Sequence, residues 1–273
     1  MLQEEILKLI ENISPHAKEY VYNSFENVEI LYSIFTLHNK GVFIKVDNKD
    51  CCIFYASFLK EDNIGDVLEL IKYKTNEYIS KMNSKELCFN VYGNNSKIIN
   101  LVRELGFKLD MEGYHLEYRG KELPQLKDCN LTDNGFENGM LKEFVDLFDS
   151  AYEKLNIDNG WKTKRYAVNE EQFNQKLNIL NKLNQVCSFW ANNELIGAYT
   201  FQQNYITDIV VRPIYQNNGY GSYILAHCIR NMSINKSVNN IRLRVAKSNT
   251  GAKKLYEING FVEIACFSEH TYK

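Results

Sequence analysis

Apolar residues recur along this chain with two periods, one typical of helices and one typical of strands. Helix-type spacing in the second half covers four segments, at residues 140–155, 170–183, 221–232 and 250–258. Strand-type patterns cover residues 186–191, 195–202, 205–211, 241–245 and a last segment that begins at Phe261. Asn192 and Asn193 separate the first two strands, as in a β-hairpin. Helices interleaved with a mostly antiparallel sheet predict an α/β (α+β) fold.

The chain contains an internal repeat with a constant offset of 154 residues. Asn95, Leu101, Gly106 and Phe107 recur as Asn249, Leu255, Gly260 and Phe261, each pair 154 positions apart. In both copies Asn is expected to cap a helix, Gly to end it in the left-handed conformation, and Phe to begin the next strand. Residues 118–130 interrupt the periodicity. We therefore expect two copies of one α/β domain, at residues 1–122 and 123–273.

Composition narrows the function classes. Hydrophobic residues make up 45% of the chain, which is enough for a folded core, and the formal charge of -2 provides no attraction to nucleic acid or to a membrane surface. No stretch is long and apolar enough to span a bilayer, and the N-terminus lacks the basic region of a signal peptide. Seven scattered cysteines without a C-x-x-C pair favour the reducing cytoplasm and argue against a metal site.

The stretch at residues 208–225 carries the strongest chemical signal. An apolar strand runs through a glycine-containing loop into an amphipathic helix. Glycines allow several backbone N–H groups to approach one anion, and the N-terminus of the helix adds its positive dipole end. A diphosphate suits such a loop, whereas the alternative is an ordinary turn followed by a packing glycine. The loop is neither a Walker loop nor a dinucleotide fingerprint, because the required Lys-Ser/Thr and third glycine are missing.

Two motifs in this half resemble a known family. Gln216-x-x-Gly219-x-Gly221, preceded by Val211-x-Pro213, resembles the pyrophosphate loop of the GNAT acetyltransferase superfamily. Asn249, Tyr256 and Gly260-Phe261 resemble its second cofactor motif. The resemblance covers about residues 130–273, and the first half only through the repeat. It implies two tandem GNAT-like domains, each a mixed, mostly antiparallel sheet flanked by helices.

The resemblance also implies a role for each matching residue. Backbone groups of Ile209, Val210 and Val211 would bind the pantetheine arm of acetyl-CoA. Backbone N–H groups would hold the pyrophosphate, and they belong to Gln216, Asn217, Asn218, Gly219, Tyr220, Gly221 and Ser222. Asn249 would bind the pantetheine region, although a helix cap explains an Asn there equally well. Tyr256 would be the general acid that protonates the departing CoA thiolate, and its alternative is a half-buried helix tyrosine.

The general base is not marked in the sequence. Family members often carry a Glu on the strand before the loop, whereas here that face carries Tyr205, Thr207 and Ile209. Strict alternation places Asp208 on the opposite face. Tyr205, Thr207, Asp208, a backbone carbonyl, a relayed water and a residue from another segment therefore remain open as the base.

The first half lacks the residues of these motifs. At the repeat positions Gln216 corresponds to Asp62, Gly221 to Val67 and Tyr256 to Val102. An acid repels phosphate, a β-branched side chain blocks close approach of the backbone, and Val donates no proton. We expect residues 1–122 to form a degenerate GNAT-like domain that walls the substrate cleft.

The loop at residues 156–168 links the two helices that border the acceptor site in this fold. It combines Trp161, Arg165 and Tyr166 with a flexible Asp-Asn-Gly turn. A substrate lid is one interpretation, and an ordinary exposed loop with one packed Trp is the other.

Together these features predict an N-acetyltransferase in which the primary amine of a small-molecule or peptide acceptor attacks acetyl-CoA directly in a ternary complex. The alternative is a non-catalytic CoA-binding regulatory or interaction protein, and a third interpretation transfers a longer acyl group. We expect a cytoplasmic monomer or homodimer without a metal.

Overall fold

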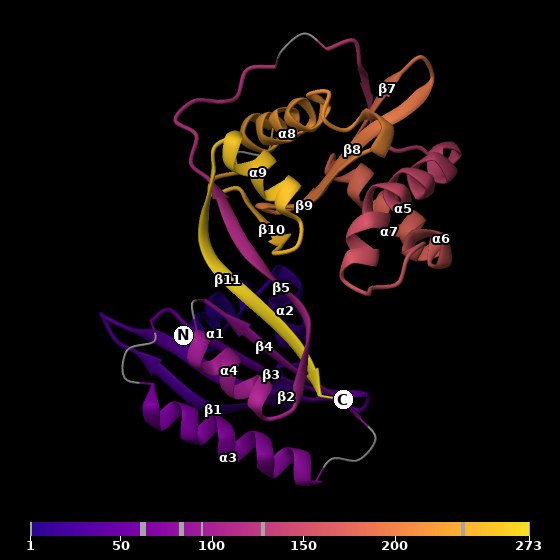
Figure 1. Ribbon diagram of the computed structural model, residues 1–273. Helices are drawn as coiled ribbons and strands as arrows, with labels where there is room; N and C mark the ends of the chain where they lie inside the picture. The colour runs from indigo at the N-terminus through magenta and orange to yellow at the C-terminus, as the bar shows by residue number, and fades with distance from the viewer. Residues whose placement is uncertain are drawn as a thin grey trace. The chain divides into compact units, whose positions relative to one another are not determined.

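The computed structural model describes residues 2–60, 64–81, 85–93, 95–126, 129–235 and 238–272. The chain separates into two compact units, the first comprising Met1–Tyr114 and Ala265–Lys273 and the second comprising His115–Ile264. Two long strands, β5 (Phe107–Tyr118) and β11 (Phe261–Tyr272), each run from one unit into the other (Figure 1). The division into functional domains at residues 122 and 123 stays a prediction.

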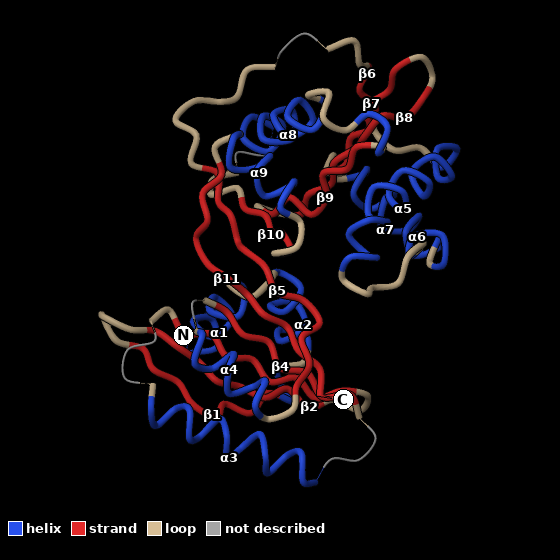
Figure 2. Tube along the Cα trace, viewed as in Figure 1, coloured by secondary structure: helices blue, strands red, loops and turns tan. Residues whose placement is uncertain are grey.

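The first unit is a mixed sheet with helices on both faces (Figure 2). Its helices are α1 (Leu2–Glu11), α2 (Pro15–Asn23), α3 (Gly65–Lys81) and α4 (Ser96–Glu104). Its strands are β1 (Val28–Phe35), β2 (Lys40–Asp47), β3 (Cys51–Phe58) and β4 (Glu86–Tyr92), together with parts of β5 and β11. All neighbouring strands from β1 to β4 are antiparallel except β3 and β4, which are parallel.

Alternation along β2 explains the two cores of the first unit. Val42, Ile44 and Val46 point to one face and pack with α1 and α2, whereas Phe43 points to the other face. On that second face, Phe54 and Phe89 from the next two strands pack beside Phe43 under α3 and α4. The apolar period of two therefore places one core on each side of the sheet.

The second unit repeats this plan. Its helices are α5 (Leu141–Asp158), the short α6 (Arg165–Val168), α7 (Glu170–Lys182), α8 (Tyr220–Arg230) and α9 (Thr250–Ile258). Its strands are β6 (Thr132–Asn134), β7 (Val186–Ala191), β8 (Glu194–Gln202), β9 (Tyr205–Val211) and β10 (Arg242–Ala246), with parts of β5 and β11. The order β6-β7-β8-β9-β10 is antiparallel up to β9, and β9 and β10 are parallel. The predicted α/β (α+β) fold is confirmed.

The predicted offset of 154 residues recurs in the elements themselves. Helix α4 begins at residue 96 and α9 at 250, β5 begins at 107 and β11 at 261, and β3 begins at 51 and β9 at 205. Gly106 and Gly260 end the two helices with φ of 96° and 90°, which a residue with a side chain rarely adopts. Apart from the short β6 and α6 of the second unit, the helices and strands described in the two units thus follow the same order.

The two asparagines before the matched helices act differently. Asn249 caps α9, because its side-chain oxygen accepts a hydrogen bond of 3.2 Å from the backbone N–H of Ala252. The predicted cap by Asn95 is wrong, since its side chain makes no bond to α4. Instead its Nδ2 donates to the carbonyl of Phe58, at 3.2 Å, and to that of Tyr92. Asn95 therefore joins the ends of β3 and β4.

None of the helices in the described part of the chain combines the length and the apolar character that crossing a bilayer requires.

Candidate active site

Strands β9 and β10 in the second unit separate after a short stretch of pairing. Only Tyr205 and Ile206 of β9 pair with β10, opposite Arg242 and Leu243. Beyond that point the described residues of the two strands, 207–211 and 244–246, have no ladder partners across the gap. The backbone edge of β9 at residues 209–211 therefore faces a split in the sheet, where an extended ligand can bond to it as an added strand would.

The loop at the end of β9 presents a row of backbone donors. Asn217 and Gly219 adopt left-handed φ of 63° and 86°, and α8 begins directly after them. Within the described residues, the backbone N–H groups of residues 217–222 have no hydrogen-bond acceptor. Such consecutive donors at the N-terminus of an eleven-residue helix favour an anion. The loop thus has the geometry expected for binding a diphosphate.

Side chains hold this loop in place. The Gln216 side chain donates to the carbonyl of Val211 at 3.0 Å, and the Asn218 side chain donates to the carbonyl of Gln216 at 3.3 Å. A Cβ on Gly221 would lie 3.2 Å from the side chain of Leu255, so the glycine allows α8 and α9 to pack closely. Gly221 is therefore a packing position as well as a loop residue.

Tyr256 lies on α9 and is buried, with its ring 5.9 Å from that of Phe261. Burial, followed by the negative charge of Asp208 and a contribution from Cys228, raises the pKa of Tyr256 above its usual value. Its hydroxyl forms no hydrogen bond with any described residue. A protonated phenol without a hydrogen-bond partner among the described residues, within electrostatic reach of a carboxylate, is suited to donate a proton to a ligand.

Asp208 occupies a polar cluster on the α5 and α7 face of the sheet. Its carboxylate accepts hydrogen bonds from the hydroxyl of Tyr152, at 2.9 Å, and from that of Thr200, and the Lys176 ammonium lies 3.8 Å away. Burial and then the Asp208 charge raise the pKa of Tyr152. Asp208 itself is only 8% exposed. Tyr152, Lys176 and Thr200 belong to other elements, and nothing in their local sequence distinguishes them.

The prediction that Thr207 and Asp208 point to opposite faces is wrong. Both side chains approach the same Thr200 hydroxyl. Phe201 pairs with Ile206 and Thr200 pairs with Asp208, so Thr207 is an extra residue, a β-bulge. A bulge interrupts the alternation on which the prediction relied.

Part of the loop predicted at residues 156–168 packs against the hydrophobic core. Tyr166 packs its ring 4.6 Å from Phe173 and 5.1 Å from Phe148, and its backbone N–H donates to Asp149 at 2.9 Å. The backbone N–H of Trp161 donates to the carbonyl of Asn156 at 2.8 Å. Tyr166 is thus fixed by packing, and a lid that includes Trp161 stays a prediction.

The first unit differs at each equivalent place. Its parallel strands β3 and β4 pair over seven residues, from Cys51 to Ser57, without the split. Val67 and Val102 are buried in the core, whereas Asp62 lies outside the described residues.

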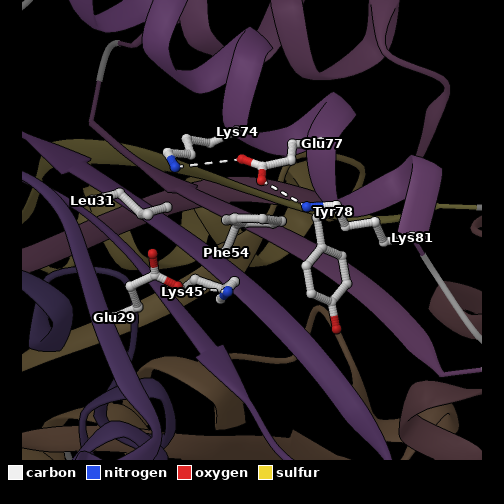
Figure 3. A pocket seen from close by; sticks show the side chains of 8 residues that line it. All are labelled: Glu29, Leu31, Lys45, Phe54, Lys74, Glu77, Tyr78 and Lys81. Carbon is white, nitrogen blue, oxygen red and sulfur yellow. Dashed lines mark hydrogen bonds and ion pairs between the residues drawn. The ribbon is translucent and has the colours of Figure 1, made fainter.

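A hollow of about 280 Å³ lies between α3 and the sheet of the first unit (Figure 3). Each of its three lysines forms an ion pair with a neighbouring glutamate: Lys45 with Glu29 at 2.6 Å, and Lys74 and Lys81 with the same Glu77 at 3.4 and 2.8 Å.

Among the described residues, no group of three or more His, Cys, Asp or Glu side chains is arranged to hold a metal ion.

Comparison with known proteins agrees with this geometry. Residues 149–270 match the family model described as the acetyltransferase (GNAT) domain. This part of the chain is therefore similar to the GNAT acetyltransferases, and the predicted resemblance is confirmed. No curated protein sequence matches the chain.

Solved structures share the fold over most of the chain. A GCN5-related N-acetyltransferase from Sphaerobacter thermophilus is 13% identical with a TM-score of 0.60, covering 98% of this chain and 91% of its own. A GNAT-family acetyltransferase from Colwellia psychrerythraea is 14% identical with a TM-score of 0.56, covering 88% and 84%. A third, from Kribbella flavida, is 9% identical with a TM-score of 0.54, covering 97% and 95%. At such identities the likeness concerns the fold.

Proposed function

We propose that this chain is an N-acetyltransferase that transfers the acetyl group of acetyl-CoA to a primary amine of a small molecule or peptide. The observation that carries the proposal is the split between β9 and β10, which opens beside the row of N–H groups at residues 217–222. One linear ligand with a diphosphate and an amide-containing arm uses both features at once. Acetyl-CoA is such a ligand.

The cosubstrate is assigned to the second unit alone. The pantetheine arm bonds to the free backbone edge at Ile209, Val210 and Val211. The diphosphate lies against the N–H groups that begin α8. In the first unit the equivalent strands pair along their lengths, so their backbone groups are already used. We therefore infer one acetyl-CoA per chain and a supporting role for the first unit, as expected for a degenerate copy.

The reaction needs two proton transfers. The amine attacks the thioester carbonyl, so a C–N bond forms while the C–S bond breaks. Tyr256 gives its hydroxyl proton to the departing CoA sulfur as negative charge develops there. The proton released from the nitrogen passes to the carboxylate of Asp208, and solvent then restores both residues.

Asp208 is chosen over the other base candidates because of its surroundings. Its carboxylate is held by Tyr152 and Thr200 on the face that α5 and α7 cover, and it acts on the pKa of Tyr256. Tyr205 is a poorer candidate because its hydroxyl is 3.3 Å from Nδ1 of the buried His115. Thr207 carries no group that accepts a proton at neutral pH.

Thermal stability in the presence of acetyl-CoA tests cosubstrate binding. At 100 times its dissociation constant, acetyl-CoA should raise the Tm by roughly 5 to 10 °C. Asn217→Asp places a negative charge in the exposed loop without changing the backbone, because Asp also tolerates a left-handed φ. We expect about a tenfold loss of affinity.

Asn193→Asp is the matched control. Asn193 is also exposed and has the same φ of 63°, but it lies in the β7–β8 hairpin. The Asn193→Asp variant should bind acetyl-CoA as the wild type does, with a stoichiometry of one by calorimetry. Failure of the wild type to bind at millimolar ligand would contradict the proposal. Binding without CoA release in the presence of amines would leave a CoA-binding protein.

A further inference from the structure

The two units provide an internal comparison of one strand pair with and without an extra residue. In the first unit β2 and β3 pair in continuous register, with Lys45 opposite Phe54 and Val46 opposite Ile53. In the second unit the matching pair β8 and β9 contains the bulge at Thr207. Pairing with the next parallel strand covers seven residues in the first unit and stops at Ile206 in the second. The split therefore begins at the bulge.

The bulge also exchanges the faces of the sheet to which the side chains of β9 point after Thr207. By the 154-residue offset, Asp208 corresponds to Phe54 and Tyr199 to Lys45. In the first unit Phe54 is paired with Lys45 and faces α3, where it lies close to Tyr78 (Figure 3). In the second unit Tyr199, which contacts His227 of α8, is paired with Ile209 instead. One inserted residue has thus moved position 208 to the α5 and α7 face.

A hydroxyl relay holds the bulge. Thr200 donates a hydrogen bond to the Asp208 carboxylate, so its only hydroxyl proton is used and it accepts from Thr207. Thr200 is 1% exposed, so these bonds are made away from water. At the corresponding positions of the first unit stand Val46 and Ile53, which cannot form such bonds. The relay and the bulge therefore occur together in β8 and β9, and both are absent from the matching strands β2 and β3 of the first unit.

We propose that Thr200 is a positioning residue that stabilises the bulge at Thr207, which parts β9 from β10 and turns Asp208 toward the acceptor side. Thr200 does not touch the reacting atoms in this proposal. Its hydroxyl fixes the conformation of β9. That conformation in turn sets the separation from β10, where the pantetheine arm would bind, and the direction of the Asp208 carboxylate. The functional meaning rests on the proposed acetyltransferase activity, whereas the effect on strand pairing does not.

Thr200→Val tests the proposal, because Val is the residue that the first unit carries at this position. Hydrogen exchange of the unliganded protein should show at least tenfold greater protection of the backbone amides in residues 208–211 and 243–246, as the strands close. The dissociation constant of acetyl-CoA should rise at least tenfold, and kcat should fall in addition. Thr200→Ser, which keeps the hydroxyl, should restore all three measurements.

Thr271→Val is the matched control, since Thr271 also donates to a carboxylate, that of Asp110 in the first unit. It should leave exchange and acetyl-CoA affinity within twofold of the wild type. Unchanged exchange in Thr200→Val, or equal effects of both valine variants, would overturn the proposal. If Thr200→Val does not fold, Thr200→Ala provides the same comparison. A protein whose strands close on Thr200 substitution but whose wild type never binds acetyl-CoA would refute only the proposed function.

Discussion

Substitution of Tyr256 can test the catalytic step without disturbing the fold. The Tyr256 hydroxyl has no hydrogen bond to a described residue, so Tyr256→Phe breaks no hydrogen bond within the described part of the folded protein. We expect kcat to fall by roughly 10²-fold, because a general acid contributes about that much or more, with the acetyl-CoA affinity unchanged. Steady-state kinetics by CoA release, together with calorimetric titration, measure both quantities.

Tyr199→Phe is the control for this substitution. The Tyr199 hydroxyl is a partner of His227 at 3.3 Å and accepts from Asn231 at 2.9 Å, so its loss should cost about 1 kcal/mol of stability. It should not change kcat. Asp208→Asn keeps the shape of the second proton-transfer group and should lower kcat as well. Equal kcat in Tyr256→Phe and the wild type would remove Tyr256 from the mechanism.

The sequence motif proposes the residues of the candidate site, but it gave the wrong relative directions for Thr207 and Asp208. The loop at residues 216–222 and Tyr256 follow from a linear motif, because glycines and a helix start can be recognised locally. The direction of Asp208 depends on the register between β8 and β9, which no single strand encodes. Tyr152 and Thr200 reach Asp208 from other elements, so only the fold brings them together.

At the scale of elements, Gly197 controls how α8 lies on the sheet. A Cβ at this position would be 2.5 Å from the Val210 carbonyl oxygen and 2.6 Å from the Ile224 side chain. Gly197→Ala should therefore destabilise the fold by about 3 kcal/mol, as overpacking does when the backbone cannot yield. Chemical denaturation followed by circular dichroism measures the free energy of unfolding.

Gly251→Ala is the control, because it makes the same substitution at a position where the added methyl group meets no other atom. Gly251 lies in the first turn of α9, and a Cβ added there would have no neighbouring atom within 4 Å. Ala should stabilise the protein by about 0.5–1 kcal/mol, since it loses less backbone entropy than Gly in a helix. A Gly197→Ala variant as stable as Gly251→Ala would show that α8 can move away from the sheet without cost.

Element positions were the most predictable part of the fold. The predicted bounds of β7, β9 and α9 match the structure, because each is framed by turn or capping residues. The offset of 154 residues carried this information into the first half. The bulge at Thr207 was missed because the alternation around it looks regular in sequence, whereas the separation of β9 from β10 at residues 209–211 was expected only from the family resemblance.

The whole molecule should respond to pH through its buried aromatic and imidazole groups. Burial raises the pKa of Tyr55, Tyr199 and Tyr256, so these phenols keep their protons in the folded state. Above about pH 10 the unfolded chain loses these protons and the folded chain does not, so stability falls. Burial lowers the pKa of His227 and His270, so stability also falls below about pH 6.5, where the unfolded chain gains protons.

Thermal melts between pH 5 and pH 11 measure this dependence. We expect a plateau of Tm at about pH 7 to 9, with a decline on each side. His227→Gln and His270→Gln together should flatten the acid side and leave the alkaline side in place. A Tm that is constant from pH 9 to pH 11 would contradict the burial of these phenols.

The passage of β11 from one unit into the other has a consequence for how the chain is made. Residues 267–271 pair with β4 at residues 88–92, and Cys88 and Thr271 are 183 residues apart. At about 5–20 residues per second, a ribosome needs roughly 9–37 s to supply that partner after β4 has been synthesised. During this interval the apolar edge of β4 is uncovered and open to pairing with other nascent chains. The first unit to emerge is thus completed only after the second unit has been translated, when β11 becomes available to pair with β4.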